Sequence, residues 1–121
     1  MNFLRKLFGL PNAPEKPSLQ EIDAETVRAW QKNGDCLLID VREDREYKVE
    51  RIKGARLAPL SRLEQAVPPS SDGSKAVFLC QSGMRTRTHA GRLQRCGFSE
   101  AYILRGGMSA WKAAGLPVER G

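Results

Sequence analysis

One stretch of this sequence has the residue types and the spacing for nucleophilic chemistry. Cys80 is followed by residues 81–83, which are small or flexible, and Arg85 comes after a gap of four residues. Gly83 can adopt a positive φ, so the backbone N–H groups of such a loop can converge on an anion. These N–H groups, the start of a following helix and the Arg85 guanidinium all stabilise a thiolate. The pattern predicts that Cys80 is a reactive nucleophile rather than an inert core residue.

The elements that must position Cys80 are two buried strands and a helix. Residues 36–41 and 76–80 are continuous apolar runs, which are typical of parallel strands covered on both faces. The second run ends at Cys80, and residues 85–96, followed by Gly97, are expected to form the next helix. Ligands bind outside the carboxyl ends of the strands in sheets of this kind. Cys80 is therefore expected at the ligand-binding edge of the sheet.

Strands and helices alternate along the rest of the chain from residue 18 onward. Alternation predicts an α/β fold with a mainly parallel sheet and helices on both faces. The other expected strands are 18–22, 55–57 and 101–104. The other expected helices are 23–32, 43–50, 61–66 and 108–114, with turns at Gly54, 70–74 and Gly106.

The length of 121 residues, with 40% hydrophobic and 28% charged residues, predicts one globular domain, which we place at 18–121. The chain lacks an apolar run of about 18 residues that could span a membrane. Residues 1–10 also lack the apolar core and cleavage site of a secretory signal. A cytoplasmic location is therefore expected.

Residues 1–17 are expected to form an appendage, because three prolines near its end interrupt regular structure. Apolar side chains in residues 3–8 have helical spacing, so one interpretation is a short amphipathic helix that touches lipid or a partner. The other is a tail or a turn packed on the domain. We favour the second over membrane contact by residues 1–10, because ten residues form only a marginal helix.

Charge and cysteine content narrow the class of ligand. The net charge of +6 attracts anions, but no Lys/Arg cluster interleaved with aromatic residues indicates a nucleic-acid partner. Small anionic substrates fit the charge equally well. Three cysteines, Cys36, Cys80 and Cys96, cannot all pair within one chain. With a single histidine, His89, and no Cys-x-x-Cys, no metal site is expected.

Four segments resemble, in order, motifs of the rhodanese-like domain family, of the single-domain thiosulfate sulfurtransferase type. They are the Asp-Val-Arg strand (38–42), the His-Ile-x-Gly-Ala turn (51–55), the active loop (79–86) and the closing Gly-Gly-Met-x-x-Trp signature with its flanks (97–118). Two positions depart from the family. Arg51 stands where the family has histidine, and Gln81 stands where it often has arginine.

The resemblance implies a five-stranded sheet and a sulfurtransferase that needs no cofactor. A small anionic donor such as thiosulfate would give its outer sulfur to Cys80, and the persulfide would pass that sulfur to cyanide, a thiol or a protein. Arg85 would hold the sulfite oxygens of the donor. The residues expected to bind the substrate are Gln81, Ser82, Gly83, Met84 and Arg85.

Loop length separates two kinds of chemistry on this fold. Dual-specificity phosphatases have a Cys-x5-Arg loop, whereas Cys80-x4-Arg85 is one residue shorter and leaves less room for phosphate or arsenate. We therefore favour sulfur transfer over phosphatase or arsenate reductase activity. A third interpretation is a non-turnover persulfide carrier for a sulfur-trafficking partner, which Gln81 and residues 1–17 suggest.

Three charged residues are expected to support the site. Asp40 and Arg42 end the first buried strand, and we expect them to form an ion pair that fixes loops rather than to act in catalysis. Arg51 is expected either to have a structural role or to add positive charge near the site.

Overall fold

The computed structural model describes residues 17–69 and 75–121. Its main sheet has five strands in the order β1-β6-β5-β2-β4, and every neighbouring pair is parallel. The strands are β1 (Gln20–Ile22), β2 (Cys36–Asp40), β4 (Arg56–Leu57), β5 (Lys75–Leu79) and β6 (Glu100–Leu104). This arrangement confirms the predicted parallel five-stranded sheet.

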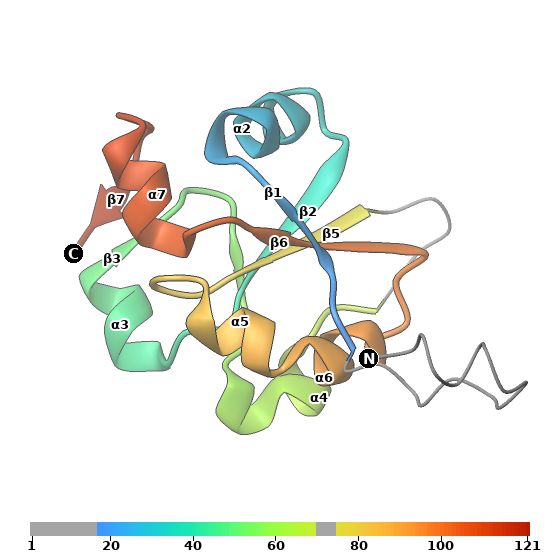
Figure 1. The fold of residues 1–121 in the computed structure, drawn as a ribbon. Helices are drawn as coiled ribbons and strands as arrows, with labels where there is room; N and C mark the ends of the chain where they lie inside the picture. Colours follow the sequence, from blue (N-terminus) through green and yellow to red (C-terminus); the bar gives the residue numbers. More distant parts are fainter. Residues whose placement is uncertain (1–16, 70–74) are drawn as a thin grey trace, which may run out of the picture.

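Helices cover both faces of the sheet (Figure 1). They are α2 (Ala24–Lys32), α3 (Asp44–Val49), the 3-10 helix η1 (Leu60–Arg62), α4 (Leu63–Ala66), α5 (Met84–Thr88), α6 (Ala90–Gln94) and α7 (Gly107–Ala113). Residues of α2 and α7 pack in one core cluster, and residues of α4 and α6 pack in the other. The sheet therefore has an apolar core on each side, as the continuous apolar strands predicted.

The central strand β5 shows why Cys80 faces the layer of α5 and α6. Side chains alternate along a strand, so Val77 and Leu79 join the α2–α7 cluster, while Ala76 and Phe78 join the opposite one. Cys80 lies two residues after Phe78, so its side chain points to the same face of the sheet and belongs to the same cluster. The strand ends at Leu79, so Cys80 is the first residue after it rather than its last.

The prediction of one helix over residues 85–96 is wrong. α5 ends at Thr88 and α6 begins at Ala90, because His89 adopts φ −103° and ψ 21°. Two β-branched threonines, Thr86 and Thr88, lower the helix propensity of this segment. The Thr86 hydroxyl also donates to the Gly83 carbonyl oxygen at 3.0 Å, which accepts the Arg87 N–H as well.

A second sheet of two short antiparallel strands was not predicted. β3 (Glu50–Arg51) pairs with β7 (Glu119–Arg120). Strands of two residues are too short to show the alternation of apolar and polar residues by which a strand is predicted. In Figure 1 this pair places the C-terminus beside α3 and α7, on the side of the molecule where the β5–α5 loop projects.

Two predictions fall on residues outside the described parts of the chain. They are the possible helix in residues 1–10 and the turn-rich loop at 70–74. The boundary between an appendage and a domain at residue 18 stays a prediction. Within 17–69 and 75–121, no helix has the length and apolar character needed to cross a bilayer.

Candidate active site

Cys80 begins the turn that joins β5 to α5, and the turn folds back over its side chain. Its side chain is 0% exposed, and its Sγ accepts a hydrogen bond from the Gly83 backbone N–H at 3.1 Å. The Thr86 hydroxyl oxygen lies 3.7 Å from the same sulfur. The loop therefore curls around the sulfur atom, as the sequence predicted.

Cys80 differs from the other two cysteines in the direction of its pKa shift. Burial raises the pKa of the Cys80 thiol, but hydrogen bonds from Thr86, Gly83 and Ser82 outweigh this effect and bring the pKa below its ordinary value. Burial raises the pKa of Cys36 to about 11 and also raises that of Cys96. Cys80 is consequently the cysteine with the greatest thiolate character.

Glycines and the start of α7 hold the loop in shape. Gly83 has φ +94°, which L side chains rarely adopt. The N–H groups of Met108 and Ser109 donate to the carbonyl oxygens of Cys80 and Gln81 at 2.9 and 3.0 Å. A Cβ on Gly107 would collide with the Cys80 carbonyl. This close approach requires glycine at position 107.

Asp40 and Arg42 form the expected ion pair, and Arg42 also contacts the Cys80 loop through Gln81. Both side chains are buried, and Arg42 Nε and Nη2 donate to the Asp40 carboxylate at 2.9–3.1 Å. Arg42 Nη2 also donates to the Glu50 carbonyl oxygen at 2.7 Å, and Nη1 donates to Gln81 Oε1 at 3.3 Å. The Gln81 amide nitrogen in turn donates to the Ser109 hydroxyl at 3.4 Å. This network ties the ends of β2, β3 and α7 to the loop.

Arg85 is paired with a carboxylate that the sequence did not single out. Its two terminal nitrogens donate to the two Glu46 oxygens, each at 2.8 Å, in a bidentate pair. Hydrogen bonding from Arg85 lowers the pKa of Glu46 to about 2, so this carboxylate is ionised at neutral pH. The guanidinium charge expected to face the donor is therefore partly neutralised.

The remaining predicted residues lie in different surroundings. Met84 is 66% exposed, and Ser82 is exposed beside it. Arg51 Nη1 donates to the Tyr47 carbonyl oxygen at 3.3 Å, and Arg51 Nε lies 3.5 Å from the Glu119 carboxylate. These contacts hold the end of α3 against β7 rather than reaching the Cys80 loop.

Sequence reasoning missed Thr86, Glu46 and Ser109. Thr86 follows Cys80 at a fixed distance within the motif, so its position carried a usable signal. Glu46 reaches Arg85 across 39 residues, and Ser109 reaches Gln81 across 28, so no local pattern indicates either contact. Across the described residues, no cluster of three His, Cys, Asp or Glu side chains could hold a metal ion.

Comparison with known proteins identifies the family. The model of the rhodanese-like domain matches residues 23–114 of this chain. The chain belongs to the rhodanese-like domain family. The match includes the Cys80 loop, the Asp40–Arg42 pair and the Gly106–Gly107 turn, so it spans the site described above.

Known rhodanese-like and related proteins resemble the chain over most of its length. An uncharacterized protein of Synechocystis is 36% identical over 97 residues, which cover 80% of this chain and 54% of that protein. The chain thus spans about half the length of this relative. Thiosulfate sulfurtransferase GlpE of Vibrio cholerae is 26% identical, covering 81% of this chain and 92% of GlpE. The crystal structure of a thiosulfate sulfurtransferase from Pseudomonas aeruginosa has a TM-score of 0.76 at 29% identity, covering 93% of this chain and 22% of that one.

Proposed function

We propose that this rhodanese-like chain is a sulfurtransferase that carries a sulfane sulfur on Cys80. The observation that supports it most is the loop-centred Cys80 sulfur, whose pKa is lowered by hydrogen bonds from Thr86 and Gly83. The names of its relatives suggest thiosulfate as a donor. The unpaired thiols of Cys36, Cys80 and Cys96 fit a reducing compartment, and we propose the cytoplasm.

The first half-reaction charges the cysteine. The Cys80 thiolate attacks the outer sulfur of thiosulfate, a new S–S bond forms, and sulfite leaves with the electrons of the old S–S bond. The loop N–H groups that now face Sγ would stabilise the resulting persulfide anion. In the second half-reaction a nucleophile takes the outer sulfur, and Cys80 leaves as a thiolate. A low thiol pKa favours this departure.

The charges around the loop favour weak binding of a doubly charged donor. Gln81 supplies no cation, and Glu46 neutralises part of the Arg85 charge. Arg85 would still orient donor oxygens through N–H groups that Glu46 does not occupy. The same neutralisation supports the second candidate function, in which Cys80 receives sulfur from a partner protein and thiosulfate is a poor donor.

Intact-mass measurement of the full chain after treatment with thiosulfate tests the proposal. We expect the wild-type protein to gain one sulfur atom, the Cys80→Ser variant to gain none, and added cyanide to yield thiocyanate. No gain from thiosulfate, but a gain from a persulfidated protein or polysulfide, would favour the carrier. A wild-type protein that gains sulfur from none of these donors would refute both.

A further inference from the structure

A shallow hollow of about 450 Å³ lies beside the Cys80 loop, between α3 and β3. It is lined by Arg42, Arg45, Glu46, Val49, Glu50 and Gln81. Gln81 is the residue next to Cys80, so the hollow adjoins the mouth of the loop. Thiosulfate is far smaller than a hollow of this size, which falls in the range of sites for organic ligands.

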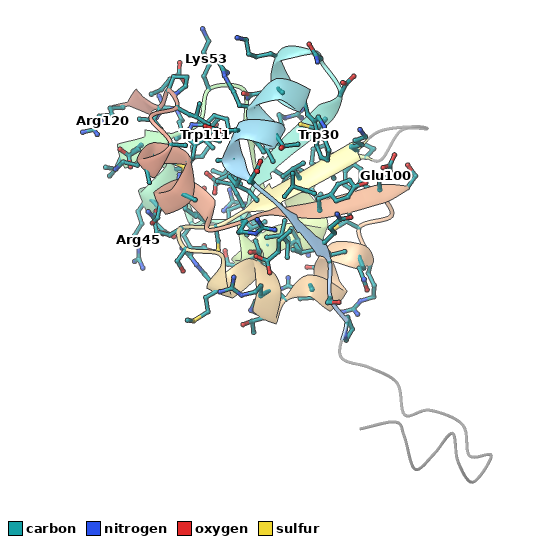
Figure 2. The ribbon with its side chains drawn as sticks, turned by 45° about the horizontal axis from the view of Figure 1, so that its top comes forward. Trp30, Arg45, Lys53, Glu100, Trp111 and Arg120 are labelled. Atoms are coloured by element: carbon teal, nitrogen blue, oxygen red, sulfur yellow. The ribbon has the colours of Figure 1, made fainter. Side chains whose placement is uncertain are left out.

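One cation of this hollow has no partner in the described structure. Within 17–69 and 75–121, no hydrogen bond or ion pair engages the Arg45 side chain. By contrast, Glu46 is bound to Arg85, and Glu50 is bound to Lys112 at 2.9 Å. Arg45 is exposed and projects from the ribbon in Figure 2. Since the acids of the hollow already have cationic partners, Arg45 is the group ready to bind an added anion.

The hollow also has an apolar wall. Val49 is 70% exposed, and it and Met84 are the large hydrophobic side chains left exposed among the described residues. Val49 lies four residues after Arg45, so both side chains lie on one face of α3, about one helical turn apart. A ligand with a short aliphatic chain and an anionic end can contact both residues.

We propose that this hollow binds the sulfur acceptor, and that the acceptor is a small aliphatic thiol with a carboxylate. The Arg45 guanidinium binds the carboxylate, Val49 packs against the chain, and the thiol faces the loop beside Gln81. This proposal rests on the sulfurtransferase function proposed above, because it assigns a site to the second substrate.

In the second half-reaction the reacting atom is the outer sulfur of the persulfide rather than Sγ. The Cys80 side chain is 0% exposed, whereas the outer sulfur of its persulfide lies about 2 Å beyond Sγ. The acceptor thiolate attacks this outer sulfur, an S–S bond forms to the acceptor, and the bond to Sγ breaks with its electrons on Cys80. The products are an acceptor persulfide and a free Cys80 thiolate, so no further oxidant or reductant is needed.

The test measures this half-reaction alone, with the full chain already carrying sulfur on Cys80. The loaded protein is mixed with 3-mercaptopropionate or with 3-mercapto-1-propanol, which has the same chain length and no charge. The loss of the outer sulfur is followed by rapid quenching and intact mass. The ratio of the two rates is compared between variants, which cancels the intrinsic reactivity of each thiol.

We expect Arg45→Gln to lower the acid-to-alcohol rate ratio roughly fivefold, the upper range for one solvent-exposed charge pair. Lys48→Gln is the matched control, because Lys48 is an exposed cation of the same helix that does not line the hollow. It should leave the ratio unchanged. Val49→Ser should slow both thiols to a similar extent.

An unchanged ratio in Arg45→Gln would overturn the proposal. An equal fall in Arg45→Gln and Lys48→Gln would also overturn it, since the preference would then come from the general positive field rather than from the hollow. Failure of the proposed function is seen separately, because the protein would then acquire no sulfur on Cys80 from any donor and there would be no loaded state to discharge.

Discussion

At the scale of single residues, we expect Thr86 to favour the ionisation of Cys80. Its side chain is buried, its hydroxyl lies 3.7 Å from Sγ, and its hydrogen bonds lower the pKa of Cys80. Valine has nearly the same shape without the hydroxyl, so Thr86→Val should raise the pKa of Cys80. Alkylation of the Cys80 peptide by iodoacetamide, measured against pH by mass spectrometry, should shift to higher pH.

Thr88→Val is the control for this change. Thr88 is exposed on the same short helix, so its replacement should leave the pH profile in place. If Thr86→Val shows the wild-type profile, the backbone N–H groups of Ser82, Gly83 and Thr86 lower the pKa without the hydroxyl, and the Thr86 side chain serves only to pack the loop.

Glu46 is a second residue whose effect can be measured, because it neutralises part of the Arg85 charge. Its pKa of about 2 keeps it ionised throughout any enzyme assay. Glu46→Gln removes this negative charge, so the KM for thiosulfate should fall by roughly two- to fivefold, as is usual for a partly exposed charge. Steady-state formation of thiocyanate measures the change.

Glu64→Gln is matched to it, because Glu64 forms a similar pair with Arg92 that joins α4 to α6 rather than α3 to α5. It should leave the KM unchanged. A KM for Glu46→Gln equal to or above the wild-type value would mean that Glu46 mainly holds Arg85 in a binding orientation.

Local spacing explains which site residues the sequence could predict. Cys80 and Arg85 share one loop, and Asp40 and Arg42 are two residues apart, so adjacency alone was enough to expect the loop and the ion pair. The Arg85–Glu46 and Gln81–Ser109 contacts join segments distant in the sequence, and only the packing of α3 and α7 against the loop creates them. The expected role of Arg85 in holding donor oxygens stays a prediction, and its pairing with Glu46 is what the local spacing did not indicate.

At the scale of elements, the contact between α7 and the Cys80 loop can be tested through glycine. Gly107 has φ +56°, and an added Cβ would collide with the Cys80 carbonyl. Gly107→Ala should therefore destabilise the protein by more than about 3 kcal/mol, since both backbone strain and a steric clash contribute. Persulfide formation should also fall, because α7 donates the N–H groups that hold the loop. Urea unfolding and intact mass measure the two effects.

Gly115 provides the comparison for this variant. It also has a positive φ, +74°, but an added Cβ would meet nothing within 4 Å. Gly115→Ala should cost only about 1–2 kcal/mol, the strain of the left-handed conformation. Equal costs for the two variants would mean that α7 shifts easily and does not anchor the loop.

The predictability of the elements follows from their length and neighbours. The five-residue strands β2 and β5 could be predicted from the sequence because their apolar runs are continuous. Helix α2 could be predicted from its N-cap Asp23, whose side chain accepts a hydrogen bond from the Thr26 N–H at 2.8 Å. The break at His89 could not be predicted, because residues 85–89 contain no glycine or proline that would mark a helix end. The β3–β7 pair could not be predicted either, because it joins residues that are about 70 positions apart in the sequence.

At the scale of the whole molecule, two ion pairs join helices that are distant in the sequence. Glu46 links α3 to α5, and Glu64 links α4 to α6 through Arg92. Hydrogen bonding from their arginine partners lowers the pKa of each carboxyl from 4.5 to about 2. Both carboxylates therefore stabilise the fold above about pH 4.5, and this stabilisation is lost as the pH falls toward 2.

These two lowered pKa values predict how the free energy of unfolding changes with pH in acid. Between about pH 4.5 and 2, the unfolded chain binds protons at these two positions while the folded protein does not, so acid favours unfolding. In a Glu46→Gln/Glu64→Gln variant, the free energy of unfolding should be lower at pH 6 but should fall less steeply between pH 5 and 2.5. Urea titrations at constant ionic strength measure both slopes. Equal slopes would mean that general repulsion among the 20 Lys and Arg side chains, rather than loss of these two pairs, causes the acid sensitivity.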